Sequence, residues 1–217
     1  EFDRSFLTLQ PTMGLITNLD LEHLDCYENL EDLQNAFTQF ANAVPFYGKV
    51  GICIDHTNTA TIIPNIKRPV VTFGINDEAE VKVSNLRYNQ NHTAFDVSVE
   101  NETLGEFRIH LPGKHNVINA LGAITLALEL DIPYENIQRG LDQYTGVRRR
   151  FEIKYIMDNG IIIVDDYAHH PSEVSSTIQA AKSGWGRRLI AIFQPHLFTR
   201  TRDFYQEFAQ AFQQSDI

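Results

Sequence analysis

The stretch Val50-Gly51-Ile52-Cys53-Ile54-Asp55 decides the fold class, because an apolar run that ends in a carboxylate is typical of a buried strand. Residues 14–17 and 70–74 are short runs of the same kind. Before the quoted stretch, residues 29–44 carry apolar side chains at steps of three and four, which form one face of a helix. Strand, helix and strand in this order predict a parallel sheet with crossover helices, and therefore an α/β fold.

The apolar period changes to two between about residues 80 and 111. Apolar and polar side chains alternate over 95–100 and again over 107–111, with Asn- and Gly-containing turns between the segments. This alternation predicts half-buried antiparallel strands, so we expect a small antiparallel β subdomain here. Helical spacing returns at 117–128, and a shorter helix is predicted at 134–144.

A second α/β pattern follows the polar and basic stretch at 145–150, which is the best candidate for a domain boundary. We predict two domains, residues 1–148 and residues 149–217. The turn Asp158-Asn159-Gly160 predicts a hairpin. Beyond it we expect a helix at 171–182, a strand at 189–193 and a last helix that carries Phe204, Phe208 and Phe212.

The composition excludes several classes of protein. The 217 residues include 28 Asp and Glu against 18 Lys and Arg, and the formal charge of −10 would repel nucleic acid and anionic membranes. Cys26 and Cys53 show neither metal spacing nor a disulfide framework, which is typical of a reducing compartment. No apolar run approaches the roughly 18–20 residues that span a bilayer. We expect a soluble, cytoplasmic protein without a nucleic-acid or membrane partner.

Five polar clusters fall where predicted strands end or predicted helices begin, which is where open α/β sheets bind their ligands. They are residues 17–25, 113–119, 148–151, 164–171 and 193–203. The first cluster has carboxylates and an imidazole that could reach a divalent cation, but its composition favours a solvated acidic loop with a helix cap. The second could bind a heterocycle and an anion, or could be a Gly turn before an Asn-capped helix.

The other three clusters differ in how strongly they favour function. Three consecutive arginines suit a polyphosphate, and a solvated basic linker fits them equally well. The cluster at 164–171 places two carboxylates, a phenol and two imidazoles directly after an apolar strand, which favours function. In the last cluster, Gln194, His196, Arg200 and Arg202 could face one cleft, or could form a helix cap with a surface ion pair.

In this order, the clusters resemble those of the Mur ligases, the ATP-dependent amide-forming enzymes of peptidoglycan synthesis. The resemblance rests on Asp3-Arg4-Ser5-Phe6-Leu7, Thr17-Asn18 with His23-Leu24-Asp25, Pro45-Phe46-Tyr47-Gly48, Pro112-Gly113-Lys114-His115-Asn116 with Asn119-Ala120, Arg149-Arg150-Phe151, Asp165-Asp166-Tyr167-Ala168-His169-His170-Pro171, and Phe193-Gln194-Pro195-His196 with Thr199-Arg200-Thr201-Arg202. The motif Gln-Pro-His-x-x-Thr-Arg-Thr points to the alanine-adding branch of the family.

The resemblance implies a ligase that joins L-alanine to the carboxylate of UDP-N-acetylmuramate through an acyl phosphate, with ATP and Mg²⁺ as cofactors. It implies a truncated central ATPase domain with a mainly parallel sheet, followed by the first half of a Rossmann-like C-terminal domain. Two alternatives stay open. One is another amide ligase of the family, such as the peptide-recycling muramate ligase, and the other is a non-catalytic nucleotide-binding module.

The resemblance also implies a role for individual residues. Those that would line the cleft where the acyl phosphate meets alanine are Tyr167, His169, His196 and Arg200. Those that would hold ATP are His115, Asn116 and Asn119 at adenine, Arg149 at phosphate and Asp166 at ribose. His23 would be a ligand of Mg²⁺.

Two departures from the family pattern bear on activity. The two Gly-Lys pairs are followed by Val50 and His115, so neither forms a Gly-Lys-Thr or Gly-Lys-Ser phosphate loop. We expect that loop and a metal-binding glutamate upstream of Glu1, and we expect the 217-residue chain alone to be inactive. Leu197 also stands where some relatives carry a basic residue, which puts the substrate contacts there in doubt.

Overall fold

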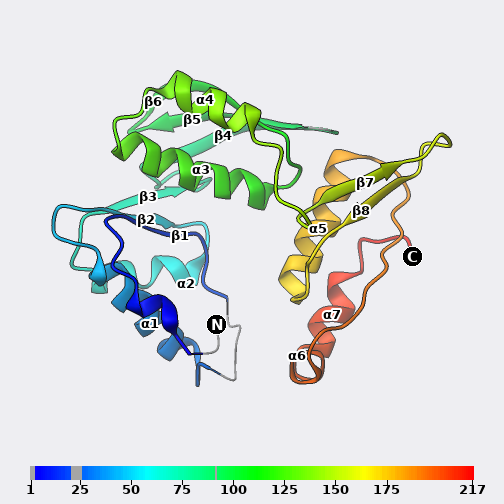
Figure 1. Cartoon of the computed structure of the whole chain (residues 1–217), viewed down its shortest axis with the longest axis horizontal. Coiled ribbons are helices and arrows are strands. Elements are labelled where there is room, and N and C mark those ends of the chain that lie inside the picture. Colours follow the sequence, from blue (N-terminus) through cyan, green and yellow to red (C-terminus); the bar gives the residue numbers. More distant parts are fainter. Residues whose placement is uncertain (1–2, 21–25, 91) are drawn as a thin grey trace. The chain divides into compact units, whose positions relative to one another are not determined.

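The computed structural model describes residues 3–20, 26–90 and 92–217 (Figure 1). Its contacts divide the chain into two compact units. The first unit comprises residues 1–85, 95–107 and 118–139, and the second comprises residues 86–94, 108–117 and 140–217. Among the described residues, no helix combines the length and the apolar character needed to cross a bilayer.

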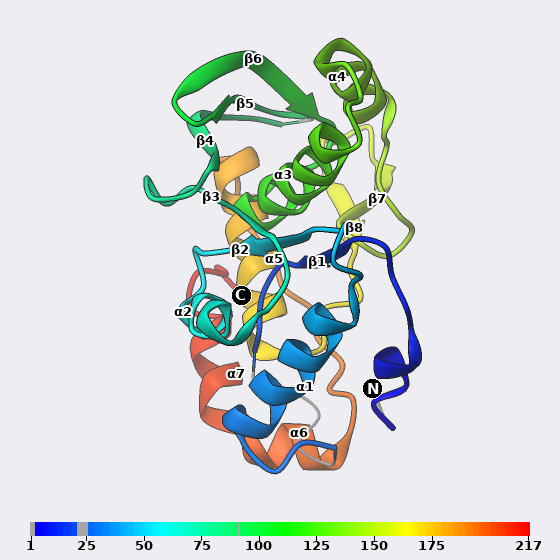
Figure 2. The same cartoon turned by 90° about the vertical axis from the view of Figure 1, so that its left-hand side faces the viewer.

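Three parallel strands form the centre of the first unit. Strand β1 (Gly14–Ile16) pairs with β2 (Val50–Cys53), and β2 pairs with β3 (Val70–Gly74). Helix α1 (Leu30–Ala43) begins after Asn29, whose side chain accepts a hydrogen bond from the backbone N–H of Asp32 at 2.9 Å. Figure 2 shows α1 on one side of β1 and β2 and α3 (Lys114–Glu129) on the other. The predicted parallel α/β arrangement is confirmed.

The sheet continues without a break into the segments that have a period of two. Strands β4 (Val81–Asn89), β5 (His92–Val99) and β6 (Glu102–Ile109) complete a six-stranded sheet in the order β1 to β6. Between β5 and β6 only Glu100 and Asn101 intervene, with φ of 48° and 74°, as a two-residue hairpin turn requires. So short a connection can join only antiparallel neighbours. The antiparallel part therefore extends the parallel sheet rather than forming a separate one.

The core of the first unit is closely packed. Phe73, Phe95 and Phe107 are at most 1% exposed, and Phe95 and Phe107 stack with their ring centroids 6.3 Å apart. A neighbouring cluster of buried residues joins β1 and β2 to α1 through Ile16, Val50 and similar side chains. Burial of large apolar side chains is what stabilises this unit.

In the second unit, residues beyond 149 form a hairpin and helices. The hairpin consists of β7 (Glu152–Ile156) and β8 (Ile162–Asp165), which pair antiparallel and meet at a turn where Gly160 has a φ of 82°. The hairpin predicted from Asp-Asn-Gly is confirmed. The helices are α4 (Tyr134–Gln143), which begins in the first unit, and α5 (Pro171–Gly184), α6 (Phe198–Asp203) and α7 (Tyr205–Ala211).

The first unit also contains short helical segments, at Ser5–Thr8, Thr57–Ala60 and Ile63–Asn65.

The prediction of a strand at 189–193 is wrong. In the described part of the chain, this segment does not belong to a sheet. Its first residues form two backbone hydrogen bonds with the end of the chain. Asp216 N–H donates to Leu189 O at 2.9 Å, and Ala191 N–H donates to Ile217 O at 2.8 Å. An apolar run predicts an extended backbone, but a strand also needs a neighbour along its length.

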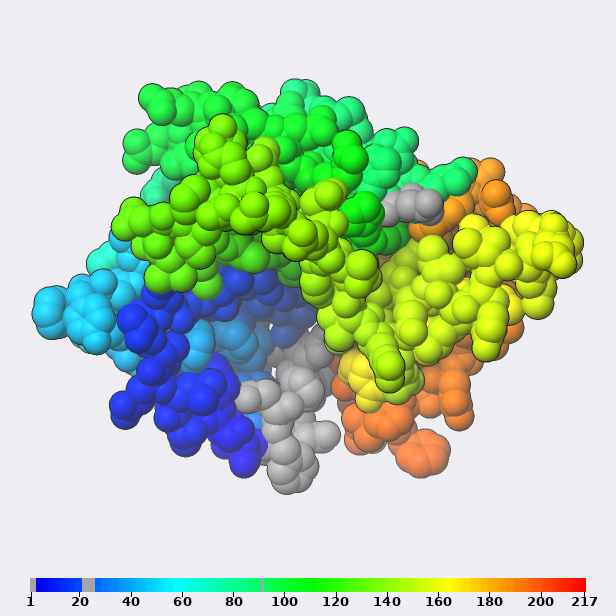
Figure 3. Space-filling view, turned by 45° about the horizontal axis from the view of Figure 1, so that its top comes forward, coloured from blue at the N-terminus to red at the C-terminus, as the bar shows by residue number. Residues whose placement is uncertain are grey.

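Apolar side chains of the second unit are less completely covered than those of the first. Its small core contains Val174, Ile178, Phe208 and Ala211, which are 5–8% exposed. Tyr155 and Ile156 on β7 are 67% and 69% exposed, and the hairpin (yellow) lies at the surface in Figure 3. The hairpin is therefore held by its own hydrogen bonds and by polar contacts at its ends more than by burial.

Candidate functional site

The structure places most of the predicted site residues in the second unit. Those are His115, Asn116, Arg149, Asp166, Tyr167, His169, His196 and Arg200. Asn119 lies in the first unit and is exposed on α3. His23, the predicted Mg²⁺ ligand, falls outside the described residues, and among the described ones no group of three His, Cys, Asp or Glu side chains could hold a metal ion.

The start of α3 is packed against α5 through a glycine. Gly113 has a φ of 94°, and a Cβ built on it would lie 2.8 Å from the Cβ of Ala180. This position therefore requires glycine for both its backbone conformation and its space. Next to it, the side-chain amide of Asn116 donates to Pro112 O at 2.7 Å. Asn116 thus orders the turn before the helix as a donor from within α3, and not as the side-chain cap of an Asn-capped helix start, which would accept from backbone N–H groups.

His115 is held as a neutral ring in a charged environment. Burial lowers the pKa of its imidazole, the nearby Asp166 opposes this shift, and the nearby Arg150 adds to it. A neutral imidazole has one donor and one acceptor nitrogen, which is the hydrogen-bonding capacity that a planar heterocycle needs. The same interactions bring the second and the fourth sequence cluster into one electrostatic environment.

Asp166 connects the end of β8 to the junction before β7. One carboxylate oxygen accepts from Phe151 N–H and the other from Ala168 N–H, both at 2.7 Å. The side chain therefore positions the backbone on both sides of the hairpin. Each oxygen keeps a second lone pair, so a ligand hydroxyl would have to share the carboxylate with these backbone groups.

Arg149 presents an exposed cation beside Tyr167. Its side chain is 58% exposed, and its guanidinium carbon lies 4.5 Å from the centre of the Tyr167 ring. Its Nε lies 3.9 Å from a carboxylate oxygen of Asp165. Arg149 and Phe151 have left-handed backbone conformations, with φ of 58° and 46°. This arrangement keeps a guanidinium at the surface where it could meet a phosphate.

Glu173 is a site residue that sequence reasoning missed. Its Oε2 accepts from the backbone N–H groups of His169 at 2.9 Å and His170 at 3.3 Å, and its Oε1 lies 3.3 Å from Nη1 of Arg150. Burial acts to raise the pKa of Glu173, but the hydrogen bond from His169 N–H, the electrostatic interaction with the His169 ring, and the hydrogen bonds from His170 N–H and Arg150 together outweigh it and lower that pKa. A signal was present in the sequence, because Pro171 and Glu173 follow His170 as the first and third residues of a capping box.

Phe204, the residue directly after the last cluster, makes an aromatic contact with the fourth cluster. The His170 ring lies edge-on to Phe204, with a centroid distance of 5.0 Å. His196 is exposed, whereas Nη1 of Arg200 lies below the surface without a hydrogen-bond partner among the described residues. Leu197 is half exposed and has a φ of 70°. In the described part of the chain, neither His196 nor Arg200 is hydrogen-bonded to Tyr167 or His169.

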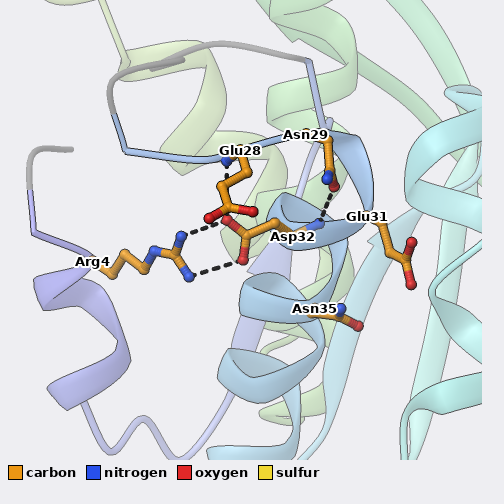
Figure 4. A pocket seen from close by; sticks show the side chains of 6 residues that line it. All are labelled: Arg4, Glu28, Asn29, Glu31, Asp32 and Asn35. Carbon is orange, nitrogen blue, oxygen red and sulfur yellow. Dashed lines mark hydrogen bonds and ion pairs between the residues drawn. The ribbon is translucent and has the colours of Figure 1, made fainter.

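A shallow pocket of about 400 Å³ in the first unit has a structural explanation (Figure 4). Arg4 Nη1 and Nη2 donate to the two carboxylate oxygens of Asp32 at 3.0 and 2.5 Å, and the guanidinium lies 4.7 Å from the ring centre of Tyr27. Arg4 holds the pKa of Asp32 below its ordinary value through these hydrogen bonds. The pair joins the segment before the helical turn Ser5–Thr8 to the first turn of α1, so Arg4 has a structural role here.

Comparisons of the sequence with known proteins all point to the Mur ligases. Residues 3–127 match the Mur ligase middle domain, and residues 149–217 match the Mur ligase glutamate ligase domain. The chain is 48% identical over 217 residues to UDP-N-acetylmuramate–L-alanine ligase of Chlorobium chlorochromatii and 44% identical to that of Geotalea daltonii, covering 46% and 47% of those proteins. The chain therefore spans about half the length of the curated relatives that it matches.

Solved structures agree with these matches. The structure is similar to UDP-N-acetylmuramate-alanine ligase MurC from Thermotoga maritima, with a TM-score of 0.80 and 27% identity over 99% of this chain and 46% of that one. MurF ligase from Thermotoga maritima in complex with ADP has a TM-score of 0.77 at 15% identity, over 93% of this chain and 46% of that chain. At that identity the likeness to MurF concerns the fold alone.

Proposed function

We propose that this chain, which belongs to the Mur ligase family, acts as part of a UDP-N-acetylmuramate–L-alanine ligase. The observation that carries the proposal is the 43–48% identity, over the whole chain, to relatives that bear this name. In the proposed reaction the muramate carboxylate attacks the γ-phosphate of ATP and forms an acyl phosphate. The amine of L-alanine then displaces phosphate and forms the amide.

The residues around β8 and α5 support the nucleotide half of this reaction. The neutral ring of His115 offers a donor and an acceptor to adenine, and Asn119 is exposed one helical turn further along α3. The exposed guanidinium of Arg149 would neutralise phosphate charge, which is the main task of a protein in phosphoryl transfer. These residues would bind ATP. Mg²⁺ would be held by His23, a role that rests on the sequence pattern alone.

The residues of the last cluster support the amino-acid half. Arg200 has a guanidinium nitrogen below the surface that could receive the carboxylate of alanine. Tyr167 and His169 would lie beside the reacting amine, with ring centroids 5.0 Å apart. The 43–48% identity to relatives named UDP-N-acetylmuramate–L-alanine ligase favours the alanine-adding activity over peptide recycling.

A chimera tests the proposal. Residues 1–217 would replace the matching segment of the Chlorobium chlorochromatii ligase, which supplies the rest of a complete chain. We expect phosphate release that requires ATP, UDP-N-acetylmuramate and L-alanine together. The matching segment of the Salinibacter ruber ligase, inserted at the same junctions, controls for the tolerance of the host. If this control is active and the chimera folds but shows no response to L-alanine, the proposal is wrong.

In the same chimera, Asn119→Ala tests the adenine contact. Loss of one or two hydrogen bonds should weaken the binding of ATP by about 1–3 kcal/mol and leave the affinity for UDP-N-acetylmuramate unchanged. Steady-state kinetics with each substrate varied in turn would measure both. A normal KM for ATP would remove Asn119 from the site.

A further inference from the structure

The ring of His169 is fixed at one of its two nitrogens. Nδ1 lies 2.8 Å from the carbonyl oxygen of Tyr167 and 3.2 Å from Oε2 of Glu173. A carbonyl oxygen and a carboxylate oxygen can only accept hydrogen bonds. Nδ1 must therefore carry the proton, and Nε2 is the nitrogen that remains for a substrate.

The carboxylate of Glu173 is itself held in place. Oε2 accepts from the backbone N–H groups of His169 and His170, which closes the capping box at the start of α5. Oε1 is within reach of the guanidinium of Arg150. With both oxygens engaged, the carboxylate cannot rotate away from Nδ1 without breaking the helix cap. The contact is thus a consequence of how the helix begins.

We propose that Glu173 is a positioning residue that, with the Tyr167 carbonyl, fixes the proton of His169 on Nδ1 and leaves Nε2 to accept a proton from the incoming amine. The inference rests on the proposed function, because the amine is that of L-alanine. The ammonium group of alanine gives one proton to Nε2, which leaves its lone pair free to attack the acyl phosphate. The resulting imidazolium lies against the Glu173 carboxylate, while Arg150 and the Tyr167 ring are the other polar groups at hand.

The position of the ring proton can be measured without any substrate. Long-range ¹H–¹⁵N correlation spectra of the 217-residue chain, with histidine labelled, distinguish a protonated Nδ1 from a protonated Nε2. The His169 signal is assigned by its loss in His169→Gln. We expect the proton on Nδ1. A neutral ring that carries its proton on Nε2 would overturn the inference and leave the proposed function untouched.

The kinetic consequence is tested in the active chimera with Glu173→Gln. The amide keeps the length of the side chain and an oxygen for the helix cap, but it lacks the charge that stabilises an imidazolium. We expect kcat to fall about 10-fold or more with the KM for ATP unchanged. The defect should shrink as pH rises, because more alanine then arrives already deprotonated, and Glu173→Asp should restore part of the rate.

Asp216→Asn provides the matched control. Asp216 is also a carboxylate that accepts from a backbone N–H, that of Leu189, and from a cation, Lys182. Within the described residues it makes no hydrogen bond or ion pair with His169. We expect its kcat and pH profile to match those of the parent chimera. If Glu173→Gln behaves like Asp216→Asn in an active chimera, Glu173 only caps the helix and the inference is wrong. An inactive parent chimera would instead contradict the proposed function.

Discussion

The sheet of the first unit and the hairpin-and-helix segment of the second are stabilised in different ways. Phe73 and Phe95 are fully buried in the sheet, whereas Tyr155 and Ile156 on the hairpin are exposed by more than 65%. In the second segment, Asp166 and Glu173 instead connect loops and helix ends through hydrogen bonds to backbone N–H groups. The candidate site lies where polar contacts, rather than burial, set the geometry. Substitutions should therefore affect the two regions through different interactions.

The largest expected effect is that of Phe73→Ala in β3. Truncating this fully buried ring should lower the free energy of unfolding by about 3–5 kcal/mol. Phe208→Ala in the smaller core, where the ring is 8% exposed, should cost less. Urea unfolding followed by circular dichroism would measure both. Equal losses would contradict the contrast between the two regions.

A tryptophan allows the second region to be followed by itself. Trp185 is the single tryptophan of the chain, and it stacks on Phe151 with the ring centroids 5.4 Å apart. Asp166→Ala removes the acceptor of Phe151 N–H and should lower the free energy of unfolding seen by tryptophan fluorescence by about 1.5–3 kcal/mol. Asp166→Asn, which keeps one acceptor oxygen, should cost less. If neither variant moves the fluorescence transition, Asp166 has no role in holding the junction.

Gly113→Ala should have a smaller effect, about 1–2 kcal/mol. A side chain at this positive φ is strained, and the new Cβ would press on Ala180. Adding Ala180→Gly relieves this contact but leaves the backbone strain and a second close contact, with Cε1 of His115 at 2.9 Å, so it should recover only part of the loss. Thermal unfolding of Gly113→Ala, of Ala180→Gly and of the double variant would separate the contribution of the Ala180 contact from the rest. Full recovery in the double variant would show that space alone decides the residue at 113.

The smallest expected effect is a pH dependence due to His115. Its pKa is lowered by burial, so between about pH 6.5 and that lowered pKa the unfolded chain binds a proton that the folded chain does not. Acid therefore favours unfolding, and stability should fall as pH falls through about 6.5. The difference between the parent and His115→Gln, measured by urea unfolding from pH 7.5 to 5, isolates this effect. Parallel curves would contradict it.

Local patterns predicted the elements of the fold but not the contacts that hold the site. Helix α1 was predictable because its apolar face and its cap at Asn29 are written in neighbouring residues. The strand expected at 189–193 failed because pairing depends on residues distant in the sequence. The resemblance implies Asp166 as a ribose ligand, but its contacts with Phe151 and Ala168 depend on a turn that no motif specifies.

The left-handed backbone at Arg149 sets stability against function. A glycine there would adopt the φ of 58° without strain and could gain about 1 kcal/mol, but it would remove the guanidinium from beside Tyr167. A laboratory selection for heat resistance alone should therefore enrich glycine at position 149. A selection in which growth depends on ligase activity should keep arginine. The two outcomes would reveal whether evolution has retained this residue in spite of its conformation and for the sake of its charge.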